Sequence, residues 1–206
     1  MRTRRRAICW VAGGGSGAPL PIPAVERLAH DLFLALDALR AAQLVHRDVK
    51  PANVLFRANG EAVLGDLWLV RDFNSDATRL TRDGAVLGTL AYLAPELLTG
   101  GSFSEATDRY AAGITLYEAL TGRHPTGYKL IPAGFEFRAP AQLRPEAPAP
   151  LAELIADLVH PDPHARPGSA GEVLARLKGE PATARVSNRA LGRVTGSAAA
   201  RKRPRR

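Results

Sequence analysis

The feature that most constrains the fold is the stretch TDRYAAGITLYEALT at residues 107–121, which is apolar on nearly every side. A helix with apolar residues all round must be enclosed by other elements, so this stretch predicts a helix through the middle of a domain. Gly122 follows directly, and glycine commonly ends a helix by adopting left-handed backbone. We expect one domain with terminal extensions, because the chain has 206 residues.

The segments before this helix predict a second helix and a hairpin. Apolar residues recur at helical spacing over residues 24–42, which is typical of an amphipathic helix. The Asn-Gly pair at 59–60 lies between VLFR (54–57) and EAVL (61–64), which favours a β-hairpin. Residues 66–96 lack clear periodicity and predict a long functional loop.

The segments after the central helix predict less regular structure. Residues 123–150 are rich in proline and are expected to be irregular. Two short helices are expected near 150–159 and 169–178, the second beginning with a capping box formed by Ser169 and Glu172.

Charge separates the ends of the chain from its body. The net charge is +8, but residues 1–9 contribute +4, residues 179–206 contribute +7, and the stretch between them is close to −3. A nucleic-acid-binding domain is expected to carry positive charge on its folded body, so nucleic acid is an unlikely partner. We interpret 1–9 as a basic N-terminal segment and 179–206 as a basic disordered tail.

The chain has the features of a cytoplasmic protein. Its single cysteine, Cys9, excludes an internal disulfide and fits a reducing compartment. The longest apolar run near the N-terminus, residues 7–12, is too short for an export signal, and no stretch approaches the length needed to span a bilayer. We therefore expect no membrane association.

The stretch HRDVKPAN at residues 46–53 has the groups that phosphoryl transfer requires. Asp48 can orient an acceptor hydroxyl and take its proton, and Lys50 can reach the transferring phosphate. Asn53 offers an amide oxygen to Mg²⁺, and Asp66, just past the predicted hairpin, offers a carboxylate.

HRDVKPANVL resembles the catalytic loop of eukaryotic-type serine/threonine protein kinases of the bacterial kind, and further motifs follow in the family's order. GTLAYLAPE (88–96) resembles the end of the activation segment, Asp108 matches the aspartate that opens the family's buried helix, and DPHARP (162–167) resembles the late arginine motif. The resemblance predicts an ion pair between Arg166 and Glu96. We refer to residues 46–53 as the catalytic loop.

The resemblance implies a fold, an activity and cofactors. The fold is α+β and mainly α: the large C-terminal lobe of a protein kinase over residues 10–178, with a small β-hairpin at the active-site face. The activity is ATP-dependent phosphorylation of serine or threonine hydroxyls on a protein substrate. Asp48 is then the catalytic base, Lys50 contacts the γ-phosphate, and Asn53 and Asp66 bind Mg²⁺.

The resemblance also implies an acceptor-site residue and a regulatory set. Thr89 resembles the threonine that bonds the catalytic aspartate and lysine and shapes the acceptor site. Arg47 precedes the base, as in kinases that are switched by phosphorylation of the activation loop. Thr78 and Thr81 are the candidate phosphate acceptors, with an ordinary polar loop as the alternative.

Two departures from the family pattern stand out. No lysine precedes Lys50 and no suitable glutamate precedes the helix at 24–42, so the expected N-terminal lobe is missing and GGGSG (13–17) reads as the linker between lobes. Trp68 stands where the family has the glycine of Asp-Phe-Gly, and a bulky residue resists the backbone angles that glycine permits.

Three readings therefore remain open. The chain is a serine/threonine kinase whose small lobe is absent from this sequence, or a noncatalytic large-lobe module that docks other proteins, or a nucleic-acid-associated protein that acts through its tails. In the first two, a protein partner is expected to cover the apolar face toward the missing lobe.

Overall fold

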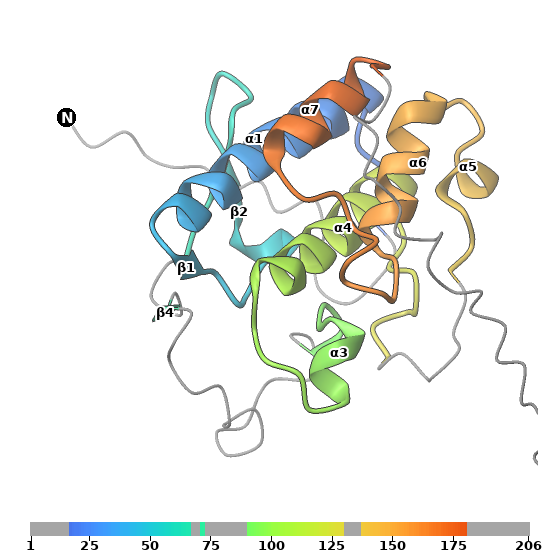
Figure 1. Ribbon diagram of the computed structural model, residues 1–206. Coiled ribbons are helices and arrows are strands. Elements are labelled where there is room, and N and C mark those ends of the chain that lie inside the picture. The colour runs from blue at the N-terminus through green and yellow to red at the C-terminus, as the bar shows by residue number, and fades with distance from the viewer. Residues whose placement is uncertain (1–16, 67–70, 73–89, 130–136, 181–206) are drawn as a thin grey trace, which may run out of the picture.

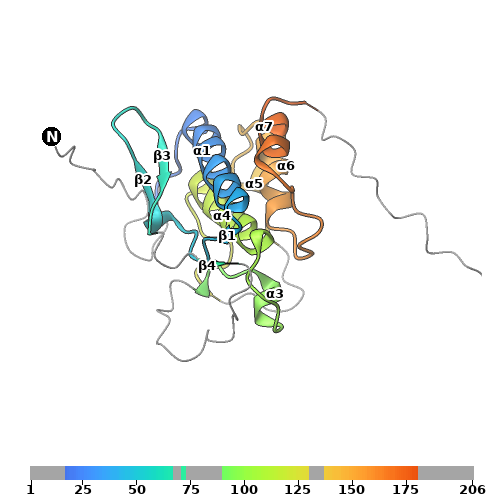
Figure 2. The ribbon, with the colours of Figure 1, turned by 60° about the vertical axis from the view of Figure 1, so that its left-hand side comes forward.

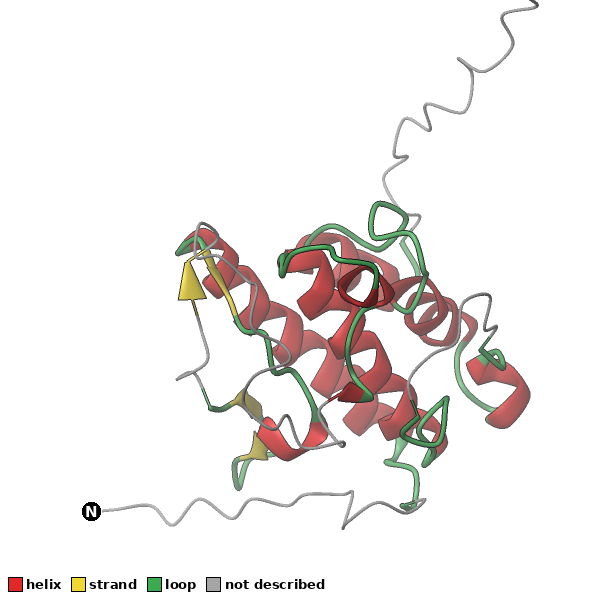
Figure 3. Ribbon diagram, turned by 90° about the horizontal axis from the view of Figure 1, so that it is seen from below, coloured by secondary structure: helices red, strands yellow, loops and turns green. Residues whose placement is uncertain are grey.

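A computed structural model describes residues 17–66, 71–72, 90–129 and 137–180. Helices make up about half of this part, and two short strand pairs lie to one side of them (Figure 3). The helices are α1 Ile22–Ala41, η1 Pro51–Asn53, α3 Pro95–Leu98, α4 Glu105–Thr121, α5 Pro140–Leu143, α6 Ala149–Leu158 and α7 Ala170–Leu177. No helix in these ranges is both long and apolar enough to cross a membrane.

The predicted central helix is α4, and it is buried on all sides as expected. It begins two residues earlier than predicted, at Glu105, where the Thr107 hydroxyl accepts a hydrogen bond from the Ser104 backbone N–H at 3.1 Å. It ends at Gly122, whose φ of 70° is left-handed. Helices α1, α6 and α5 pack around it, with α7 against α1 and α6 (Figure 1).

Helix α7 begins with half of the predicted capping box. The Ser169 hydroxyl accepts from the Glu172 backbone N–H at 3.2 Å, as expected. The Glu172 carboxylate accepts instead from the backbone N–H of Gly168 at 2.7 Å, one residue before the expected donor. The first bond satisfies an N–H group that the helix itself leaves without a partner, and the second satisfies the N–H of the residue before the cap.

The predicted hairpin is confirmed, with β2 Val54–Phe56 antiparallel to β3 Ala62–Leu64. It stands beside α1, on the side away from α6 and α7 (Figure 2). A second pair joins β1 Leu44–Val45 to β4 Arg71–Asp72. The interpretation of 66–96 as one long loop was therefore wrong at β4 and at α3.

Residues 123–150 also contain an element that the sequence analysis missed. Helix α5 is a single turn led by Pro140, within the stretch expected to be irregular. Arg144, which follows it, donates to the carbonyl oxygens of Leu120 at 2.9 Å and of Leu20. The turn thus ties the last carbonyls of α4 to the segment that enters α1.

Helices α4 and α6 pack closely at Gly113. A Cβ atom at this position would lie 2.7 Å from the Leu158 Cβ and 3.1 Å from a Val159 methyl group. Gly113→Ala should therefore lower the free energy of unfolding by about 1–3 kcal/mol through overpacking. Urea unfolding followed by circular dichroism measures this change.

Gly171→Ala is the matched control, because a Cβ at Gly171 in α7 would meet only the Ser169 Oγ, at 3.7 Å. It should leave stability unchanged or raise it by up to about 1 kcal/mol, since alanine favours helix more than glycine. Equal effects of the two substitutions would contradict the close packing of α4 on α6.

A buried polar cluster links the end of α4 to the segment before α3. The Glu118 carboxylate accepts hydrogen bonds from the hydroxyls of Tyr92, at 2.7 Å, and Tyr128. The His124 ring stacks on Tyr128 with centroids 4.5 Å apart and meets Tyr92 edge-on at 5.2 Å. Its Nδ1 accepts from the backbone N–H groups of Thr126 and Tyr128, at 3.3 and 3.2 Å.

Burial of His124 predicts a loss of stability in acid. Burial lowers its pKa from 6.5 to about 4, and the Ala91 backbone offsets only part of this effect. The unfolded chain then binds a proton that the folded chain excludes, so stability falls as pH drops from 6.5 toward 4. The shift corresponds to a loss of about 3 kcal/mol.

His124→Asn isolates this contribution, because the asparagine oxygen can still accept where Nδ1 does and the side chain does not titrate. The stability advantage of the unmodified protein over the variant should shrink between pH 7 and pH 4, measured by urea unfolding at each pH. A pH-independent difference would contradict a neutral, buried His124.

Candidate active site

Asp108, near the start of α4, holds the backbone of the catalytic loop. Its Oδ2 accepts from the His46 backbone N–H at 2.6 Å, and its Oδ1 accepts from the Arg47 backbone N–H at 2.9 Å. Arg47 has a φ of 69°, a left-handed conformation that is costly for a residue with a side chain. Burial raises the pKa of Asp108 to about 6, although the two N–H groups lower it. Two hydrogen bonds accepted by one buried carboxylate thus stabilise a strained turn.

His46 was not singled out in the sequence, yet its buried ring joins two parts of the site. Nε2 is 2.9 Å from the Gly65 carbonyl oxygen, and Nδ1 accepts from the Asp48 backbone N–H at 3.3 Å. Burial lowers the pKa of the ring, so the neutral form is favoured. With Nδ1 as acceptor, the proton is on Nε2 and is donated to Gly65. His46 therefore links the catalytic loop to the residue before Asp66.

The structure brings Asp48, Lys50 and Asn53 together. The Lys50 Nζ lies 2.9 Å from the Asp48 Oδ2. The Asn53 side-chain nitrogen donates to the same Oδ2 at 2.8 Å and to the Asp48 backbone carbonyl at 2.7 Å. The turn η1 directs Asn53 back toward Asp48, so the carboxylate is oriented by two side chains of its own loop.

Asp66 follows the hairpin and comes directly after Gly65, whose backbone is hydrogen-bonded to that of Asn53. The Gly65 backbone N–H donates to the Asn53 carbonyl at 2.7 Å, and Asp66 itself is exposed with a φ of 55°. Because the Asn53 nitrogen makes both hydrogen bonds to Asp48, its amide oxygen is left to accept or coordinate. An amide oxygen and an exposed carboxylate fit the hard oxygen ligands that Mg²⁺ prefers.

The predicted regulatory and acceptor residues are only partly described. The Arg47 guanidinium packs over the Phe103 ring, 5.3 Å from its centroid. Three threonines of the predicted set lie outside the described residues, namely Thr78, Thr81 and Thr89. Trp68, which departs from the family pattern, lies outside them as well.

The predicted ion pair between Arg166 and Glu96 is present and bidentate. The two terminal nitrogens of Arg166 lie 2.7 and 2.8 Å from the two carboxylate oxygens of Glu96. The same guanidinium donates to the carbonyls of His160 at 2.8 Å, Ala106 at 2.8 Å and Pro161 at 3.2 Å. All five N–H donors of this fully buried arginine therefore have acceptors.

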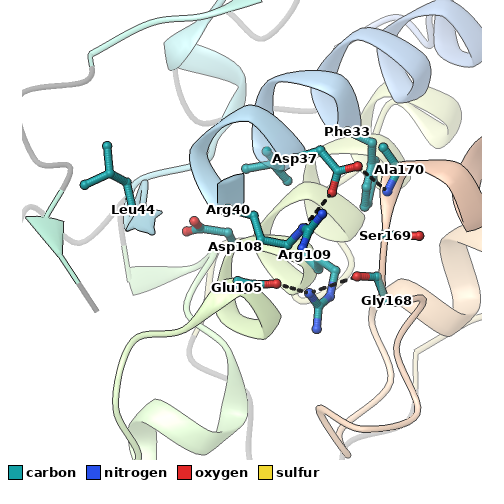
Figure 4. A pocket seen from close by; sticks show the side chains of 11 residues that line it. Phe33, Asp37, Arg40, Leu44, Glu105, Asp108, Arg109, Gly168, Ser169 and Ala170 are labelled. Carbon is teal, nitrogen blue, oxygen red and sulfur yellow. Dashed lines mark hydrogen bonds and ion pairs between the residues drawn. The ribbon is translucent and has the colours of Figure 1, made fainter. Parts of the chain in front are cut away.

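A small pocket, lined in part by Asp108, lies between α1, the start of α4 and the residues that lead into α7 (Figure 4). Its volume is about 20 Å³, which is room for a water molecule and far less than a nucleotide needs. The residues that line it include none from the catalytic loop.

Comparison of the sequence with protein families gives a match to the protein kinase domain. The family model matches residues 16–176. The chain belongs to the protein kinase family.

Bacterial serine/threonine kinases are among its relatives. PknL of Mycobacterium tuberculosis is 37% identical over 144 residues, 69% of this chain and 34% of that protein. PkwA of Thermomonospora curvata, a probable serine/threonine kinase, is 38% identical over 154 residues, 74% of this chain and 20% of that protein. PknA of M. tuberculosis is 36% identical over 140 residues. This kinase chain spans about a third or less of the length of these relatives.

The Arg166–Glu96 pair predicts a large cost when one partner is removed. The Arg166 side chain is fully buried and that of Glu96 is 20% exposed, so Glu96→Ala leaves a buried charge without its counterion. The free energy of unfolding should fall by about 3 kcal/mol. Urea unfolding measures it.

Glu61→Ala is the control, because it breaks the ion pair between Arg57 and Glu61, whose side chains are 60% and 39% exposed. That change should cost less than about 1 kcal/mol. If Glu96→Ala cost no more than Glu61→Ala, the pair would not be the structural link that its burial indicates.

Proposed function

We propose that this protein acts as the large lobe of a serine/threonine protein kinase and transfers the γ-phosphate of Mg²⁺-ATP to serine or threonine hydroxyls of a protein substrate, in the cytoplasm. The observation that carries this proposal is the convergence of Lys50 and Asn53 on the carboxylate of Asp48. Family membership supports the reaction class, and the catalytic-loop geometry supports the assignment of roles.

Asp48 is the base in this proposal. Its carboxylate is 9% exposed, so it is accessible at one side while Lys50 and Asn53 fix its orientation. A carboxylate held in this way can align an acceptor hydroxyl and take its proton. Lys50, beside it, supplies positive charge where the transferred phosphate gathers negative charge.

Asn53 and Asp66 would hold the metal, which neutralises phosphate charge when bound. Thr89 is assigned to the acceptor site, and Arg47 with Thr78 and Thr81 to regulation by phosphorylation. These four assignments rest on the motif resemblance, supported for Arg47 by its place in the turn that Asp108 stabilises.

The nucleotide also needs groups over its base and its α- and β-phosphates. The sequence has no lysine before Lys50 that could contact those phosphates. We propose that a small lobe, from further sequence or from a partner chain, completes the pocket. Without it, water reaches the phosphates, and transfer by this chain alone should be slow.

The absent lysine also favours a second candidate function, a noncatalytic module that docks other proteins. Large apolar side chains that are strongly exposed in the described ranges are Leu34, at 47%, and Leu98, at 44%, on different helices. Nucleotide binding separates the two functions, because a docking module does not require it.

Calorimetric titration of the purified chain with Mg²⁺-ATP is the deciding experiment. We expect micromolar affinity that Asp66→Ala abolishes, while Asp157→Ala, which removes an exposed carboxylate on α6, leaves it unchanged. Asp48→Asn should bind nucleotide but transfer phosphate to a protein substrate about 100-fold more slowly or worse.

Absence of binding by a folded chain would overturn the kinase proposal for this chain alone and favour the docking module. Equal loss of binding in Asp66→Ala and Asp157→Ala would overturn the assignment of Asp66. Folding of every variant is checked by circular dichroism.

A further inference from the structure

The hairpin that leads to Asp66 is held at its two ends by different elements. At the end near the catalytic loop, Gly65 donates to the Asn53 carbonyl at 2.7 Å and accepts from the His46 ring at 2.9 Å. At the far end, the Ala62 backbone N–H donates to the Oδ2 of Asp31 on α1, at 2.8 Å. The second anchor lies outside the set of residues assigned to the reaction.

Asp31 is suited to serve as an anchor. Its side chain is only 13% exposed, and its other oxygen lies 2.8 Å from the Nδ1 of His30. Ala62 is itself buried, so loss of the carboxylate would leave its N–H without an acceptor in a site that water reaches poorly. Removal of this hydrogen bond therefore costs free energy, and the apolar contacts between α1 and β3 do not compensate for it.

Apolar packing alone does not fix the angle of the hairpin. The buried side chains of Ala62 and Leu64 belong to the core cluster that includes the apolar face of α1. Apolar contacts are non-directional and tolerate small rotations, whereas a hydrogen bond to a carboxylate fixes one backbone atom in place. Ala62 lies four residues before Asp66, a span of about 13 Å along an extended strand.

A small tilt of the hairpin therefore displaces Asp66, at the end proposed to bind the metal. A rotation of about 10° over this span displaces one end by about 2 Å relative to the other. Asp66 follows immediately with left-handed backbone, so the direction of its carboxylate depends on the direction of β3.

We propose that Asp31 is a positioning residue: its carboxylate fixes the β2–β3 hairpin on α1 and thereby holds Asp66 in register with Asn53 and the catalytic loop. The role of Asp66 as metal ligand rests on the proposed function. The anchoring of the hairpin does not, and it can be measured without ligand.

Asp37 offers a matched control on the same helix. Its Oδ2 accepts from the Ala170 backbone N–H at 3.3 Å, and its Oδ1 accepts from Arg40 at 3.1 Å (Figure 4). Like Asp31, it is an α1 carboxylate that accepts a backbone N–H from a neighbouring element. Its neighbour is α7, on the side of α1 away from the hairpin (Figure 2).

The first measurement is amide hydrogen exchange in the full chain without ligand. Asp31→Ala should reduce protection of the Gly65 amide at least fivefold more than Asp37→Ala does, while amides in the middle of α4 stay unchanged. Asp31→Asn keeps an oxygen that can accept from Ala62 and should restore most of the protection. Unchanged Gly65 exchange in Asp31→Ala, or equal losses in the alanine and asparagine variants, would overturn the anchor.

The second measurement is the Mg²⁺ dependence of ADP affinity by calorimetry. Asp31→Ala should require about tenfold more Mg²⁺ for half-maximal tightening, with metal-free ADP affinity within twofold of the unmodified protein. Asp37→Ala should show no such shift even if its unfolding temperature falls equally. Equal Mg²⁺ dependence in both alanine variants would overturn the positioning role.

Failure of the unmodified chain to bind ADP would overturn the kinase proposal for this chain alone, and the exchange result would then decide the anchor by itself. The two failures are therefore distinguishable.

Discussion

The hydrogen bonds of the Arg166 guanidinium are the interaction on which the arrangement of α3, the first turn of α4 and the loop at 160–161 depends. Each of its five N–H donors has an acceptor, and the acceptors come from α3, from the first turn of α4 and from the loop at 160–161. Its Cζ also lies over the Tyr110 ring, 4.8 Å from the ring centroid. A fully buried cation is tolerable only when its donors are satisfied in this way, so the three segments are held in one arrangement.

The start of α4 organises the candidate site as well as this network. The Ala106 carbonyl accepts a hydrogen bond from Arg166, and two residues later Asp108 accepts from the backbone N–H groups of His46 and Arg47. The same helical turn thus fixes the segment that carries Glu96 and the loop that carries Asp48. The central helix therefore positions two parts of the site that are far apart in sequence relative to each other.

The sequence predicted elements whose signals are local and strong. The all-round apolar pattern located α4, and the Asn-Gly turn located the β2–β3 hairpin. The pairing of β1 with β4 was missed, because two-residue strands are too short to show periodicity. Helix α5 was missed for the same reason, as one turn led by proline reads as loop.

The candidate site was predictable to the extent that its residues are contiguous or belong to an ordered motif. Asp48, Lys50 and Asn53 come together as expected, and the motif order identified Arg166 as the partner of Glu96. The positions of Asp31 and His46 were not predictable. A carboxylate on an amphipathic helix reads as part of a solvated face, and only the fold shows which backbone N–H it meets.

Helix α1 accepts hydrogen bonds on two sides, from segments that are synthesised at different times. The hairpin that bonds to Asp31 follows within 31 residues, whereas Ala170, which bonds to Asp37, is made 133 residues after it. At about 5–20 residues per second, the α7 side of α1 stays uncovered on the ribosome for on the order of ten seconds. During this interval Phe33 and Leu36, which line the pocket beside Ala170, lack the cover that α7 gives them in the folded protein.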